Sequence, residues 1–311
     1  MKKDDCIYVA GHKGMVGSAI VRALQRDGFK NIVTASRQEL DLKDTIEVSR
    51  FFKKNQPDFV FLAAAKVGGI QANIRHPVEF LYENLEIQNN IIHSCHDNHV
   101  KKLIFLGSSC IYPAKCPQPI KEEYLLTGPL EPTNEGYALA KIAGLRLAQY
   151  YSKEYGSDCL CPMPCNLYGH SDSFDPVNSH VLSALVKKFV DAVEDDEKEV
   201  TMWGSGKARR EFMHVDDLAC ALLFLVDAWK TSDIINVGSG SDISINELAT
   251  LIAKKTRYNG SIIWDVSMPD GMMQKCLDVT KLHTLGFRSK IPLETGIDAV
   301  IQEYKQIKES T

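Results

Sequence analysis

The feature that most constrains the fold is a glycine-rich turn near the N-terminus. It joins an apolar run, Cys6–Ala10, to a segment, Met15–Arg26, whose apolar residues recur at helical spacing. In such a turn the first glycine permits a tight bend, the second lets the backbone approach a pyrophosphate, and the third lets the helix pack closely. The spacing therefore predicts a dinucleotide-binding strand-turn-helix unit. The residues expected to contact the dinucleotide here are Gly11, His12, Lys13, Gly14, Met15, Val16 and Gly17.

Strand-like and helix-like segments then alternate along the first half of the chain. This alternation predicts an α/β fold with a doubly wound parallel sheet of the Rossmann type, because helices that connect parallel strands cover both faces of the sheet. Strands are predicted over residues 31–35, 59–65 and 103–107, and helices up to Asn55, after Pro77 and from Tyr137 to Tyr155.

The regular alternation ends near residue 166. Less regular segments occupy residues 168–210 and 240–290, between returns to sheet-like sequence. We therefore expect residues 1–166 to form mainly the nucleotide-binding Rossmann domain. Residues 167–311 are expected to form mainly a smaller, interleaved substrate-binding lobe, with segments that return to the Rossmann domain.

Charge and cysteine content exclude several classes of protein. The net charge of −4 and the pI near 6.2 provide no broad basic surface of the kind that nucleic-acid binders carry. No segment approaches the roughly 20 apolar residues of a membrane span, and the first strand begins too early for a signal peptide. The nine cysteines lack the spacing of a disulfide scaffold or a zinc site. We expect a cytoplasmic protein with reduced thiols, no metal, and no nucleic-acid or membrane partner.

The end of the second predicted strand favours NADP(H) over NAD(H). The sequence there is Thr34-Ala35-Ser36-Arg37, without the carboxylate that would bind the ribose hydroxyls of NAD. Arg37, together with Lys13 and His12, is expected to hold a 2′-phosphate. Asp41 is a candidate contact on the adenine side. Small residues after the third strand are expected to let the backbone approach the cofactor, namely Ala63, Ala64 and Ala65.

Three further residues predict carbonyl reduction. Ser108 follows a predicted strand, where open α/β sheets place their chemistry, and Tyr137 and Lys141 share one face of a helix. We expect the Lys141 ammonium to lower the pKa of the Tyr137 phenol. Ser108 would hydrogen-bond a carbonyl oxygen, and Tyr137 would protonate it as hydride reaches the carbon. Tyr137 and Lys141 are also expected to contact the cofactor.

Longer stretches of the sequence resemble a known family across nearly the whole chain. The resemblance is to the GDP-L-fucose synthases, which are GDP-4-keto-6-deoxymannose epimerase/reductases of the extended short-chain dehydrogenase/reductase type. The matching stretches are 10–18, 63–70, 107–113, 131–135, 137–141, 166–169, 178–180, 210–212 and 214–217.

The resemblance implies roles for particular residues. It places the catalytic Ser, Tyr and Lys on Ser108, Tyr137 and Lys141, and an epimerisation pair on Cys110 and His180. It further implies a GDP-sugar lobe and a homodimer, which we expect to use the helices over residues 84–98 and 137–155. Asp270 is a further polar candidate in the sugar region. The implied substrate contacts are Asn166, Lys188, Trp203, Arg210 and Lys275.

An epimerisation pair makes chemical sense beside a ketone. A carbonyl at sugar carbon 4 acidifies the protons on carbons 3 and 5, and inversion needs one group to remove a proton and another to return it. A thiolate at Cys110 and an imidazolium at His180 would divide that work. Two alternatives stay open: a reductase that acts only on a related GDP-4-keto sugar such as a heptose, and a noncatalytic NADP-binding regulator. The complete set of Ser108, Tyr137 and Lys141 argues against the regulator.

Several positions depart from the family pattern. They gather around the expected sugar and diphosphate rather than the nicotinamide, so they bear on substrate identity more than on reaction type. Proline is common at position 136 and threonine at 165, and arginine is expected at 274. The residues found at the departing positions are Gly136, Cys165, His170, Ser171, Lys187, Lys188 and Gln274.

Overall fold

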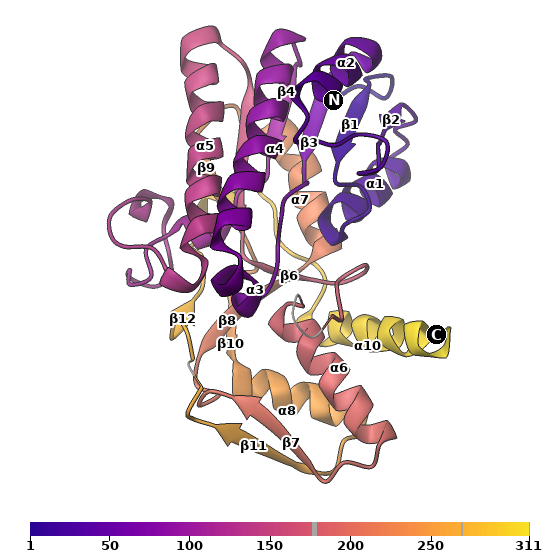
Figure 1. Cartoon of the computed structure of the whole chain (residues 1–311), viewed down its shortest axis with the longest axis vertical. Coiled ribbons are helices and arrows are strands. Elements are labelled where there is room, and N and C mark those ends of the chain that lie inside the picture. The colour runs from indigo at the N-terminus through magenta and orange to yellow at the C-terminus, as the bar shows by residue number, and fades with distance from the viewer. Residues whose placement is uncertain (176–178, 269, 311) are drawn as a thin grey trace.

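A six-stranded parallel sheet forms the centre of the larger part of the molecule (Figure 1). The computed structural model describes residues 1–175, 179–268 and 270–310. The strand order is β2-β1-β3-β4-β5-β9, and the predicted α/β fold of the Rossmann type is confirmed. The strands are β1 (Ile7–Ala10), β2 (Ile32–Val33), β3 (Phe59–Leu62), β4 (Lys102–Phe105), β5 (Cys159–Pro164) and β9 (Ile234–Val237).

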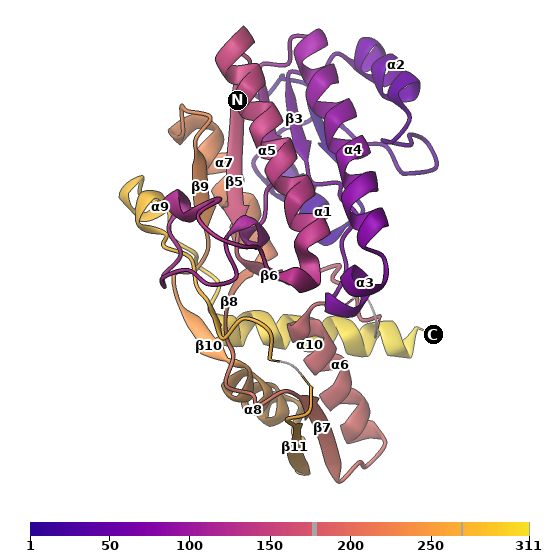
Figure 2. The ribbon, with the colours of Figure 1, turned by 60° about the vertical axis from the view of Figure 1, so that its left-hand side comes forward.

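Helices cover both faces of this sheet, which explains why every residue of β1, β3 and β4 is buried. On one face α4 packs against α5 and α2, and on the other α1 packs against α7. Figure 2 shows α4 and α5 side by side along the sheet. The five helices are α1 (Met15–Arg26), α2 (Thr45–Asn55), α4 (Pro77–Asp97), α5 (Glu135–Tyr155) and α7 (Val215–Ala228).

The chain reverses its direction of winding at β1. It goes from β1 to the edge strand β2 and then crosses back to β3, so β1 pairs with both. A crevice beyond the carboxyl ends of the strands at such a switch point is the usual ligand site of an open α/β sheet. Here the glycine turn after β1 and the alanines after β3 flank that point.

A second hydrophobic cluster lies apart from the sheet, in the lower part of Figure 1. It is built mainly from three helices that pack on one another, and its members include Leu182, Phe189, Ile252 and Val300. The helices are α6 (Val181–Glu194), α8 (Ile245–Thr256) and α10 (Leu293–Glu309).

Short strands connect this cluster to the Rossmann part. β8 is central, because β6, β10 and β12 all pair with it, while β7 pairs with β11. The chain then returns to the large sheet through α7 and β9. The strands are β6 (Asn166–Tyr168), β7 (Glu199–Trp203), β8 (Arg209–His214), β10 (Asp242–Ser244), β11 (Ser261–Asp265) and β12 (Gln274–Lys275).

Local structure differs from the predicted segments in a few places. β3 ends at Leu62, so Ala63–Ala65 lie in the loop after it, and α5 begins two residues before Tyr137. In the part of the chain that the structure describes, no helix has the length and apolar character needed to cross a membrane. The remaining short helices are α3 (Ile70–Arg75), α9 (Thr280–Thr284), η1 (Ser109–Ile111), η2 (Glu122–Tyr124) and η3 (Pro132–Asn134).

Candidate active site

The glycine turn presses directly against the loop after β3. Gly11 has a φ of +84°, and a Cβ atom built on it would lie 2.7 Å from the backbone nitrogen of Ala64. A Cβ atom on Gly17 would collide with the Gly11 carbonyl, whereas one on Gly14 would meet only the Gly11 oxygen, at 3.5 Å. The first and third glycines are therefore required by packing. The second faces open space at the N-terminus of α1, as the approach of a pyrophosphate would need.

Polar groups around this turn fit a dinucleotide phosphate. Nδ1 of His12 is buried and finds no hydrogen-bond partner within the described residues, so a phosphate oxygen would satisfy it. Lys13 is exposed beside it. Met15 and Val16 pack partly against the core of the sheet, and the Ala63 nitrogen donates to the Ala10 carbonyl at 3.1 Å. Met15, Val16, Ala63 and Ala10 thus shape the crevice through packing and backbone contacts.

The residues after β2 fit a 2′-phosphate. The Arg37 side chain is 75% exposed, and its Nη2 lies 4.0 Å from Oε2 of Glu83, so the guanidinium is free to turn toward a ligand. Glu39, which sequence reasoning missed, accepts a hydrogen bond of 2.7 Å from the Ser36 nitrogen and fixes this turn. Asp41 accepts one of 3.0 Å from the Lys43 nitrogen. Asp41 therefore has a turn-stabilising contact of its own beside its expected place near adenine.

The three residues expected to reduce a carbonyl meet at the end of β4. Ser108 precedes η1, and its Oγ accepts a hydrogen bond of 3.2 Å from the Cys110 nitrogen. Tyr137 lies in the first turn of α5 and is hydrogen-bonded to Ser108. Lys141 lies one turn further, where its Nζ donates to the Leu106 carbonyl at 2.9 Å. The hydroxyls of Ser108 and Tyr137 are thus presented together.

The effect of burial on Tyr137 corrects one expectation. Burial raises the pKa of the Tyr137 phenol, the charge of Cys110 raises it further, and the Ser108 hydrogen bond lowers it only in part. The expected lowering was wrong, because burial of the Tyr137 phenol itself is the largest effect on its pKa; burial also lowers the pKa of Lys141, to about 8. Its Nζ lies 5.8 Å from the centroid of the Tyr137 ring. Tyr137 is therefore a protonated phenol at neutral pH, the form that donates a proton.

The sulfur of Cys110 accepts hydrogen bonds from two other side chains. Nδ2 of Asn134, at the end of η3, lies 3.3 Å from its sulfur, and Nζ of Lys275, on β12, lies 3.6 Å from it. Since Cys110 follows Ser108 by two residues, its sulfur lies in the same neighbourhood as the hydroxyl of Ser108. Of these two donors, sequence reasoning had placed Lys275 at the substrate and had given Asn134 no role.

His180 is paired with a buried carboxylate that sequence reasoning also missed. Its Nδ1 lies 3.2 Å from Oδ1 of Asp172, which raises the pKa of the imidazole. Asp172 is held in turn by the Ser183 hydroxyl and the Ser173 nitrogen. No sequence spacing marks this pairing, because Asp172 and His180 are eight positions apart and share no helix or strand. Asn178, part of the motif that singled out His180, lies outside the described residues.

The expected substrate contacts follow β8 and its neighbours. Lys275 on β12 pairs in register with Arg210 on β8, and Nη2 of Arg210 donates to the Asp270 carbonyl at 3.3 Å. Burial lowers the pKa of Arg210. Nδ2 of Asn166 donates to the backbone carbonyl of Glu211 at 2.9 Å. A line of basic groups thus leads from Cys110 into the second lobe.

Further expected substrate contacts lie on β7 and beside it. The Asp270 carboxylate binds the nitrogen and hydroxyl of Ser205 at 2.7 and 2.8 Å, two residues beyond Trp203. The Trp203 side chain is exposed. Nζ of Lys188 donates to the Thr201 carbonyl at 2.6 Å. An exposed indole can cover a base or sugar, and cationic groups such as Lys188 and Arg210 can neutralise a diphosphate.

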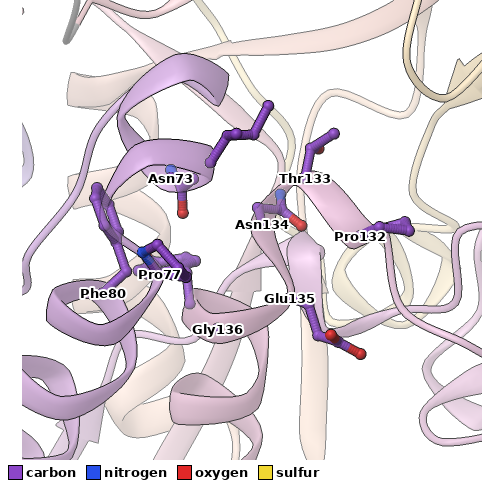
Figure 3. A pocket seen from close by; sticks show the side chains of 10 residues that line it. Asn73, Pro77, Phe80, Pro132, Thr133, Asn134, Glu135 and Gly136 are labelled. Carbon is purple, nitrogen blue, oxygen red and sulfur yellow. The ribbon is translucent and has the colours of Figure 1, made fainter.

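A pocket of about 190 Å³ opens beside the first turn of α5. Figure 3 shows Asn73 and Phe80 on one side of it and Thr133 and Asn134 on the other. Gly136 belongs to its wall, and a Cβ atom there would lie 2.9 Å from the Pro77 carbonyl oxygen. Glycine at this position therefore brings the start of α5 close to the start of α4.

Known proteins resemble this chain over most of its length. A model of the NAD dependent epimerase/dehydratase family matches residues 7–238. A putative GDP-L-fucose synthase of Arabidopsis thaliana is 50% identical over 304 residues, which are 98% of this chain and 93% of that protein.

Two solved structures are also similar along their whole length. A GDP-6-OMe-4-keto-L-xylo-heptose reductase from C. jejuni superposes with a TM-score of 0.94 at 37% identity, covering 99% of both chains. A GDP-L-fucose synthetase from Naegleria fowleri, bound to NADP, superposes with a TM-score of 0.91 at 29% identity, covering 100% of this chain and 97% of that one.

Proposed function

Because this chain belongs to the NAD dependent epimerase/dehydratase family, we propose that it converts GDP-4-keto-6-deoxymannose to GDP-L-fucose with NADPH. The resemblance to the GDP-L-fucose synthases is confirmed by the 50% identity to the Arabidopsis thaliana relative. One observation carries the proposal. Beside the reducing set of Ser108, Tyr137 and Lys141, the structure gives Cys110 and His180 separate partners suited to opposite proton transfers.

Reduction at carbon 4 uses the groups at the end of β4. NADPH, held by the glycine turn and Arg37, supplies the hydride when bound. Ser108 donates a hydrogen bond to the carbonyl oxygen, and the Tyr137 phenol gives that oxygen its proton. Lys141 anchors α5 against the Leu106 carbonyl, which holds Tyr137 at the oxygen.

Epimerisation at carbons 3 and 5 uses the second pair. The sulfur of Cys110 removes a proton beside the ketone, and the electron pair of the broken C–H bond moves onto the carbonyl oxygen, where Ser108 and Tyr137 stabilise it. His180, whose pKa is raised by the hydrogen bond to Asp172, returns a proton from the other face. Both half-reactions thus share one oxygen-binding site.

A reductase that acts on a GDP-linked 4-keto heptose is the second candidate. The observation that favours it is the overlap with the C. jejuni heptose reductase, together with the departures near the sugar, Gly136 and Cys165. The sequence identity to the Arabidopsis thaliana GDP-L-fucose synthase, 50% over 98% of the chain, is higher than the 37% identity to the heptose reductase. The GDP-linked hexose is therefore the first candidate substrate.

The assembly proposed for this enzyme is a homodimer through α4 and α5. Both helices carry exposed large apolar side chains, which a second copy would cover. We place the enzyme in the cytoplasm, where its nine free thiols would stay reduced. The GDP-sugar lobe is proposed to comprise the second hydrophobic cluster and its strands. The exposed side chains are Val78, Tyr82, Leu139, Tyr150 and Tyr155.

Incubation of the purified protein with NADPH and a panel of GDP-4-keto sugars tests this function. The expected product is GDP-L-fucose, with configuration inverted at carbons 3 and 5, identified by NMR. Formation of a 4-hydroxy sugar without inversion, from the heptose substrate alone, would replace the first candidate by the second. Light scattering across working concentrations tests the dimer, and a monomer throughout contradicts it.

A further inference from the structure

We propose that Asn134 and Lys275 are positioning residues for Cys110, which hold its sulfur as a thiolate base aimed at the sugar. The inference rests on the proposed epimerase activity. It assigns Lys275 a second role besides substrate binding. A thiolate, not a thiol, removes a proton from carbon, and it accepts hydrogen bonds from cationic and amide donors better than a neutral thiol does.

The two donors reach the sulfur from different elements. Asn134 ends η3 and Lys275 lies on β12, and their nitrogens lie 3.3 and 3.6 Å from Sγ. The Cys110 backbone is fixed as well, because its nitrogen donates to Ser108 Oγ. A sulfur with two donors and a fixed backbone has little freedom to turn away from the site.

The Asn134 amide is oriented toward the sulfur. Its nitrogen serves Cys110, while its Oδ1 is buried and has no hydrogen-bond partner among the described residues. Turning the amide over would bring an oxygen against the sulfur, which a thiol could match by donating its S–H but a thiolate could not; the observed orientation is the one that suits a thiolate. Figure 3 shows Asn134 in the wall of the pocket at the start of α5.

Lys275 is held in place from both sides. Its backbone pairs with Arg210 on β8. The next two residues are tied by hydrogen bonds of 3.0 Å, from the Cys276 nitrogen to Gln118, and 2.8 Å, from the Leu277 nitrogen to Glu211. β12 therefore presents a fixed cation from the second sheet to a cysteine that follows β4.

The other charged and titratable groups that face Cys110 do not replace this cation. Tyr137 and Lys141 on α5 interact electrostatically with the sulfur. Tyr137 stays a neutral phenol, and the Lys141 ammonium is engaged by the Leu106 carbonyl. Lys275 is the cation that bonds to Sγ directly. When the base acts, the sulfur gains the substrate proton and Lys275 keeps its own.

The pH dependence of Cys110 alkylation by iodoacetamide, followed by peptide mass spectrometry, tests the proposal without any sugar substrate. In Lys275→Met the profile should shift to higher pH, with a rate near neutral pH roughly tenfold lower, since a tenfold smaller thiolate fraction corresponds to one pH unit. Lys275→Arg should restore the parent profile. Asn134→Leu should shift it in the same direction as Lys275→Met. Lys281→Met removes a cation that instead pairs with Glu122 and is the matched control.

NADPH binding and the melting temperature check that each variant is folded. A parent-like alkylation profile in both Lys275→Met and Asn134→Leu overturns the proposal. Because this measurement needs no turnover, it can fail while GDP-L-fucose synthesis is demonstrated. It can also succeed if the substrate turns out to be another GDP-sugar.

Discussion

His180 Nδ1 lies 3.2 Å from Oδ1 of Asp172, whose side chain is only 3% exposed. The contact raises the pKa of the imidazole, so the protonated form that can act as an acid persists to higher pH than in an isolated histidine.

Asp172→Asn should move the alkaline limb of the epimerisation profile to lower pH. The carboxylate no longer stabilises the imidazolium, so His180 loses its proton earlier as pH rises. By the same linkage, the stabilisation from this pair is full below the unfolded pKa of histidine and is lost as pH rises through the raised folded pKa. Solvent deuterium exchange and thermal unfolding, each measured across pH, check both effects. Coincident profiles for parent and variant would contradict the role of Asp172.

Tyr137→Phe should retain NADPH binding and lose about 100- to 10 000-fold in reduction, the usual contribution of a general acid. The ring stays, but the proton donor to the carbonyl oxygen is gone. Fluorescence titration with NADPH and single-turnover reduction separate the two properties. Turnover at the parent rate would exclude Tyr137 as the essential acid.

Arg37→Ala should remove most of the preference for NADPH over NADH. A hydrogen bond to a charged group contributes about 1.5–3 kcal/mol, or roughly 10- to 100-fold in affinity, and screening at this exposed site favours the lower end. NADH affinity should change little, since NADH has no 2′-phosphate. Competitive binding of the two cofactors at fixed salt measures the ratio. Equal affinities in the parent would refute the assignment.

Cys110→Ser should suppress exchange of solvent deuterium into carbons 3 and 5 of the keto sugar more than it suppresses reduction of the epimerised ketone. A serine hydroxyl is a far weaker base than a thiolate, whereas the Ser108 and Tyr137 hydroxyls remain. NMR of the sugar in deuterated water without NADPH follows the exchange. If the parent reduces its ketone rapidly yet incorporates no deuterium, the epimerase activity is absent for that substrate.

The Rossmann part was predictable because its signals are local. A buried strand, three spaced glycines and an amphipathic helix lie within about twenty residues, and the helix over Met15–Arg26 has the bounds that its periodicity predicted. The spacing of Tyr137 and Lys141 similarly fixes their shared helix face. Short-range periodicity determines such features.

The partners of the proton-transfer pair were not predictable in this way. Asn134 and Lys275 reach Cys110 across 24 and 165 residues of sequence, so only the tertiary fold brings them together. The pKa of Tyr137 was misjudged for a related reason. Sequence shows that a lysine is near, but it does not show that burial outweighs the charge of that lysine.

Gly136 has a consequence for exchanging segments between family members. A Cβ atom there would lie 2.9 Å from the Pro77 carbonyl oxygen. The first turn of α4 would therefore have to shift away from α5 to accommodate any side chain at this position. A proline introduced at 136 would therefore need the same movement of α4 in this chain. Positions 77 and 136 are thus expected to show epistasis, and chimeras should take both from the same parent.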